Sequence, residues 1–102
     1  MGDFIKAARI SDIPEGQGGV FTVGGTDVAI FNIEGKVHAI QNACCHRQGP
    51  LGEGDCEGTT VTCPWHAWKY DVTTGECLSR PGANVRRYQV RVEGDDIFVE
   101  TS

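Results

Sequence analysis

The chain has 102 residues, of which 39% are hydrophobic and 23% charged, the balance of one small globular domain and not of a disordered chain. Nine basic and 14 acidic residues give a net charge of −5, which disfavours nucleic acid as a ligand because nucleic acid attracts clustered positive charge. No apolar run approaches the roughly 18–20 residues of a membrane helix, and the first residues lack a signal-peptide core, so we expect a cytoplasmic protein that does not enter a membrane.

Short β-strands are the main elements that the sequence predicts, because apolar and polar residues alternate at both ends of the chain. The pattern predicts strands at residues 20–23, 28–33, 37–40, 88–93 and 97–99. The last two form a hairpin around Gly94-Asp95, because glycine supplies the positive φ that the first position of this turn needs. No apolar stripe of helical period persists for the roughly 11–18 residues of a long helix. We therefore expect an all-β sandwich or small barrel.

Residues 42–84 differ in composition from these strands. They include all five cysteines, both tryptophans and three of the four prolines. Such composition is more typical of loops that carry a site than of a core. No linker flanks the stretch, so we expect one domain over residues 1–102, with a subdomain over about 42–84 inserted into the β base.

The five cysteines are an odd number and cannot all pair within the chain. Without an export signal, reduced thiols or metal ligands are the favoured interpretation. We expect Cys56 and Cys77 to be buried free thiols.

Two short motifs each combine one cysteine with one histidine. They are Cys44-x-His46 and Cys63-x-x-His66, separated by residues 47–62. If two such loops meet, both sulfurs can bind one metal and both imidazoles a second, which suits a two-iron cluster. A single tetrahedral zinc is the alternative, because two cysteines and two histidines are also a structural zinc set, although zinc fingers usually group like ligands together.

The two motifs resemble the signature of the Rieske [2Fe–2S] family. The similarity extends to the family's two cluster-binding loops, its proline-bearing third loop and its closing hairpin, at residues 44–51, 63–71, 80–82 and 88–99. It covers essentially the whole chain. The resemblance implies a Rieske-type all-β fold, an antiparallel base with an inserted cluster-binding subdomain, and one [2Fe–2S] cluster.

The resemblance also implies roles for single residues. The expected ligands are Cys44 and Cys63 on the inner iron, and His46 and His66 on the outer, solvent-facing iron. Cys45 is then a spacer within the first motif.

Departures from the high-potential members of the family imply a low reduction potential. Those proteins have a disulfide beside the cluster, but Gly49 and Trp65 stand at the matching positions here. Their serine donor to a cluster sulfide is replaced by Trp68, whereas Tyr70, a donor to a cysteine sulfur, is retained. Donors to sulfur stabilise the reduced cluster, so losing one lowers the potential.

One-electron transfer is the function that the resemblance implies, with an NAD(P)H-dependent flavin reductase and a terminal oxygenase as partners. Residues 65–70 also resemble the large subunits of ring-hydroxylating oxygenases. The mononuclear iron of those subunits needs two histidines and a carboxylate, and only His38 remains after the cluster has taken its ligands. We therefore expect an electron-transfer component with no catalytic residues of its own.

Two alternatives to the dioxygenase ferredoxin stay open on the sequence. One is the small subunit of an NAD(P)H-dependent nitrite reductase, with the large subunit of that enzyme as partner. The other is a zinc-stabilised interaction module. For a carrier we expect docking around His46 and His66, where the nearby Arg47, Lys69 and Arg80 suggest a neutral or weakly basic tip on an acidic body.

Overall fold

The computed structural model describes residues 4–42, 50–65, 67–80 and 82–100. These residues form nine β-strands and two short 3₁₀ turns: β1 (Phe4–Arg9), η1 (Ile10–Asp12), β2 (Gln17–Val23), β3 (Thr26–Ile33), β4 (Lys36–Gln41), η2 (Leu51–Glu53), β5 (Asp55–Glu57), β6 (Thr60–Thr62), β7 (Lys69–Asp71), β8 (Arg87–Glu93) and β9 (Asp96–Glu100). In the described part of the chain, no helix is long and apolar enough to cross a membrane.

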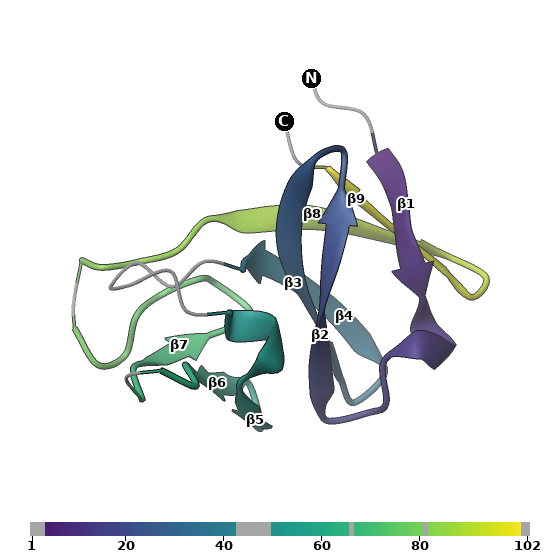
Figure 1. Cartoon of the computed structure of the whole chain (residues 1–102). Coiled ribbons are helices and arrows are strands. Elements are labelled where there is room, and N and C mark those ends of the chain that lie inside the picture. The colour runs from purple at the N-terminus through teal and green to yellow at the C-terminus, as the bar shows by residue number, and fades with distance from the viewer. Residues whose placement is uncertain (1–3, 43–49, 66, 81, 101–102) are drawn as a thin grey trace.

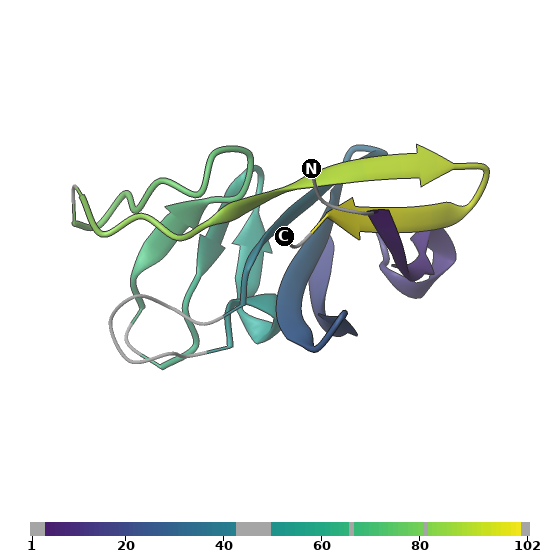
Figure 2. The same cartoon turned by 90° about the horizontal axis from the view of Figure 1, so that it is seen from above.

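The strands form two antiparallel sheets of unequal size. The larger has six strands in the order β1-β9-β8-β4-β3-β2, and the smaller has three in the order β5-β6-β7. The small sheet lies beside the large one, and a long segment leads from it into β8 (Figures 1 and 2). The predicted all-β fold, with an antiparallel base and an insert between β4 and β8, is confirmed.

Strand β3 is buried on both faces and divides the core into two clusters. Val28 and Ile30 face a cluster within the large sheet, which also contains Ile13, Tyr88, Ile97 and Val99. Ala29 and Phe31 face a second cluster between the two sheets. Because successive side chains of a strand point to opposite faces, one continuous apolar run fills both clusters.

The second cluster joins the small sheet to the base. Its members from the insert are Leu51, Val61, Cys63, Tyr70, Val72 and Cys77. Strands of three residues are shorter than the commonest length of about 5–6 residues and depend on such packing. The small sheet is therefore held to the base mainly by this buried apolar contact.

Candidate metal centre

Cys63 lies at the start of a tight turn that connects β6 to β7. The Cys63 N–H donates to the carbonyl of Trp68 at 2.7 Å, and the Ala67 N–H donates to the carbonyl of Cys63 at 3.0 Å. Ala67 has φ +59°, in the left-handed region, which lets the chain reverse within these few residues. These two hydrogen bonds thus join the first residue of the turn, Cys63, to its last residues, Ala67 and Trp68.

Burial differs sharply between the residues of this turn. Cys63 is only 1% exposed and belongs to the core cluster between the sheets. Trp68 packs against the same cluster, whereas Trp65 is 59% exposed. A buried sulfur at the start of an exposed turn fits a soft metal ligand. A bond to the metal compensates the charge of the thiolate, which the surrounding apolar core does not.

A shallow pocket of about 600 Å³ borders the turn. Its lining includes Cys63, Trp65 and two carboxylates, Glu53 and Asp55. Asp55 reaches this edge because it pairs with Thr62 across β5 and β6, one residue before Cys63. The described side of the turn therefore carries acidic groups, which the sequence did not lead us to expect.

Of the four expected ligands, the structure describes Cys63 alone. Cys44, His46 and His66 lie outside the described residues, as do Cys45 and Arg47. Among the residues that are described, no three His, Cys, Asp or Glu side chains gather as a metal site. The segment that contains Cys44 ends at Leu51, which is fully buried in the same cluster as Cys63. Leu51, which follows the first expected ligand motif, and Cys63, which begins the second, therefore pack in one core cluster.

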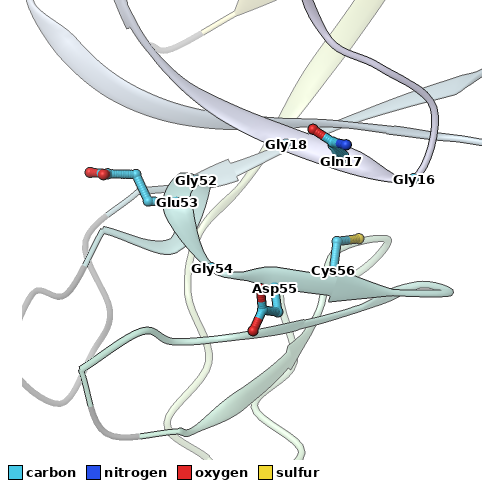
Figure 3. Close-up of a pocket in the computed structure, with 8 residues that line it drawn as sticks. All are labelled: Gly16, Gln17, Gly18, Gly52, Glu53, Gly54, Asp55 and Cys56. Atoms are coloured by element: carbon cyan, nitrogen blue, oxygen red, sulfur yellow. The ribbon is translucent and has the colours of Figure 1, made fainter.

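Cys56 and Cys77 are free thiols, as predicted; Cys77 is buried as expected, whereas Cys56 is only half-buried. The Cys77 Sγ accepts the N–H of Arg80 at 3.3 Å, and the Cys56 thiol donates to the carbonyl of Gly58 at 3.6 Å. Burial raises the pKa of Cys56, so this thiol stays protonated at neutral pH. Cys56 lines a polar cleft of about 330 Å³ between the start of β2 and the η2–β5 segment (Figure 3).

The third loop of the sequence prediction is attached to β7. The Lys69 N–H donates to the Ser79 hydroxyl at 2.9 Å, and the Leu78 N–H donates to the Lys69 carbonyl at 2.7 Å. At the other end of the loop, the Cys77 N–H donates to Asn84 Oδ1 at 3.0 Å. Pro81 lies outside the described residues.

The family model for the Rieske [2Fe-2S] domain matches residues 3–97. The chain belongs to the Rieske [2Fe–2S] family. It is 34% identical over 100 residues to the naphthalene 1,2-dioxygenase system ferredoxin component of Pseudomonas aeruginosa, covering 97% of this chain and 96% of that one. The ferredoxin of carbazole 1,9a-dioxygenase from Nocardioides aromaticivorans IC177 has a similar structure, with TM-score 0.90, 29% identity and coverage of 97% and 98%. A complex of reduced oxygenase and oxidized ferredoxin in carbazole 1,9a-dioxygenase contains a similar chain, with TM-score 0.85, 25% identity and coverage of 95% and 92%.

These findings confirm the predicted family and its cofactor, one [2Fe–2S] cluster per Rieske domain. Relatives of nearly equal length are named as ferredoxin components, so this Rieske domain is an electron carrier and not an enzyme in its own right. The zinc-stabilised interaction module has no support from the family match.

Proposed function

We propose that this Rieske protein carries single electrons from an NAD(P)H-dependent flavin reductase to the terminal oxygenase of a ring-hydroxylating dioxygenase in the cytoplasm. The observation that carries the proposal is the full-length similarity to dioxygenase ferredoxin components. The pairing of an oxygenase with a ferredoxin in the carbazole 1,9a-dioxygenase complex supports the choice of acceptor. The same relatives favour this role over that of a nitrite reductase small subunit.

The proposed ligands are Cys44 and Cys63 on one iron and His46 and His66 on the other. When bound, the cluster supplies one-electron oxidation and reduction. The burial of Cys63 supports its assignment to the inner iron, because the core around it excludes water. The exposed Trp65, at the tip of the turn, directly precedes His66 in the sequence. This supports electron entry and exit on the side of the turn where Trp65 is exposed.

The same geometry supports partner docking around this tip. Trp65 offers a large exposed apolar surface, and aromatic side chains of this kind often dominate the energy of an interface. Glu53 and Asp55 border the pocket beside it. Redox partners bury less than about 1,200 Å² in total, so a few charges around one anchor suffice to orient them.

The test is reconstitution with a flavin-dependent ferredoxin reductase and a terminal dioxygenase. Wild-type protein should contain two irons and two acid-labile sulfides per chain, give a Rieske EPR signal, and couple NADH oxidation to substrate hydroxylation. Alanine at any of the four proposed ligands should abolish the signal and the coupling, whereas Cys45→Ala should keep both. Coupling to the large subunit of a nitrite reductase, but to no dioxygenase, would replace the proposed partners. Loss of the signal in Cys45→Ala, with retention in Cys44→Ala, would overturn the ligand set.

A further inference from the structure

We propose that Asn42 is a positioning residue for the ligand-bearing segment between β4 and η2, which carries Cys44 and His46. The inference rests on the ligand set proposed above. Asn42 directly follows β4, and Leu51 opens η2, so these two residues flank residues 43–50 in the sequence.

Asn42 accepts hydrogen bonds from two consecutive backbone amides at the far end of this segment. The Leu51 N–H donates to the Asn42 carbonyl at 2.8 Å. The Gly52 N–H donates to Asn42 Oδ1 at 3.0 Å. The first bond needs only a backbone and forms with any residue at position 42. The second needs the side chain, and asparagine has the length and the acceptor for it.

Burial makes the second bond necessary. Asn42 is 9% exposed, and among the described residues only it and Asn32 are buried polar or charged side chains. Buried polar groups in proteins are nearly always hydrogen-bonded, and a buried amide that loses its acceptor carries the full cost of its desolvation. A side chain without an acceptor at position 42 leaves the buried Gly52 N–H without its hydrogen bond.

The other contacts of η2 leave it little freedom to shift. Leu51 is fully buried in the core cluster that contains Cys63. Gly52 lies so close to β2 that an added Cβ would stand 2.6 Å from Val20 Cγ2 and 2.7 Å from the Gly19 carbonyl oxygen. Figure 3 shows Gly52 on the η2–β5 segment, facing the β2 ribbon. With η2 fixed on β2 and in the core, Asn42 ties the end of β4 to it.

Both ends of the segment that carries Cys44 and His46 are thus fixed relative to Cys63. Metal sites need their ligands held in place by the surrounding structure, and loss of a residue hydrogen-bonded directly to a ligand commonly weakens metal binding about 10- to 100-fold, so the lower end of that range is the expectation for a residue one step further out. Asn42 therefore acts on the cluster through the placement of its ligands, without contacting the reacting atoms.

The experiment compares wild-type protein with five variants. In Asn42→Ala, we expect transfer of iron to a chelator to speed up about tenfold and the EPR g-values to change. Asn42→Ser keeps a polar group but is too short to reach the Gly52 amide, and should behave in the same way. Asn42→Asp keeps an acceptor at the same distance and should restore slow iron loss.

Asn32→Ala is the matched control. Asn32 is similarly buried, at 7% exposure, and its Nδ2 donates to the Ile13 carbonyl at 2.9 Å, on the other side of the base. This variant should lower the unfolding temperature but leave the EPR signal and the rate of iron loss unchanged. If both Asn42→Ala and Asn42→Ser match Asn32→Ala in these two readouts, the positioning role is refuted.

Cys44→Ala, the fifth variant, separates this inference from the ligand assignment. Loss of the EPR signal in Cys44→Ala together with wild-type behaviour of Asn42→Ala refutes the role of Asn42 alone. Retention of the signal in Cys44→Ala refutes the ligand set, and with it the basis of the inference.

Discussion

Replacing Tyr70 with phenylalanine removes one hydroxyl and should lower the reduction potential of the cluster. Tyr70 is fully buried in the middle of β7, and its ring belongs to the same core cluster as Cys63. Its neighbours across the strands are Val61 on β6 and Cys77 on the other side. Phenylalanine keeps the ring in this packing, so the variant should fold and retain the cluster.

The expected magnitude follows from a single hydrogen bond. From the resemblance to the Rieske pattern, we expect the Tyr70 hydroxyl to donate to a cysteine sulfur and to stabilise the more negative, reduced cluster. A net hydrogen bond contributes about 1 kcal/mol, which corresponds to roughly 40 mV for one electron. Removing a donor that favours the reduced state makes reduction harder. The potential should therefore fall by some tens of millivolts.

Spectroelectrochemical titration of the holoprotein measures this change, and Tyr88→Phe provides the control. Tyr88 is also buried, but it lies in the cluster within the large sheet, with the Arg86 guanidinium 5.4 Å from its ring centre. The same chemical change there should leave the potential unaltered. An unchanged or higher potential in Tyr70→Phe would show that its hydroxyl does not donate to a cluster sulfur.

Two further predictions concern charge. Arg47→Glu and Glu53→Lys both change the charge expected at the docking tip. We expect Arg47→Glu to slow reduction by the reductase, most at low ionic strength. Stopped-flow rates equal to those of wild type at every salt concentration in both variants would place docking elsewhere. Burial, followed by the charge of Arg87, lowers the pKa of His38 below its usual value of 6.5, against an opposing effect of Asp71. Because the unfolded chain then binds more protons than the folded one, His38 lowers the free energy of unfolding as the pH falls below about 6.5. Thermal unfolding between pH 5 and 8 checks this, and His38→Gln should lessen the loss of unfolding temperature at acid pH.

The sequence predicted five of the six strands of the base, β2, β3, β4, β8 and β9, with bounds close to those observed. Clear alternation marks these strands, and the hairpin of β8 and β9 turns at the Gly94-Asp95 position that was expected. Strand β1 was not predicted, because Phe4–Arg9 lacks alternation and buries little beyond Ala8. The strands β5–β7 were not predicted either, since three residues are too few for a periodic pattern.

The expected metal ligands come from local spacing, whereas the surroundings of the Cys63 turn follow from no local pattern. Cysteine and histidine at short separations are visible within a few residues of sequence. The approach of Asp55 to the Cys63 turn depends on the register between β5 and β6, which no local pattern encodes. In the same way, Asn42 looks like an ordinary residue at a strand end, and its role becomes apparent only when η2 returns beside it. The one local hint was its position at the junction between a strand and a ligand motif.

Cofactor retention and fold stability are coupled in this arrangement. The two segments that carry the expected ligands follow strands of different sheets, one after β4 of the base and the other after β6 of the insert. Buried Leu51 and Cys63 bring their roots into one apolar cluster, so a cofactor bound by both segments also cross-links the small sheet to the large one. Binding that occurs only in the folded state adds its free energy to folding. The three-residue strands of the insert gain most from this link, because they have the least core of their own.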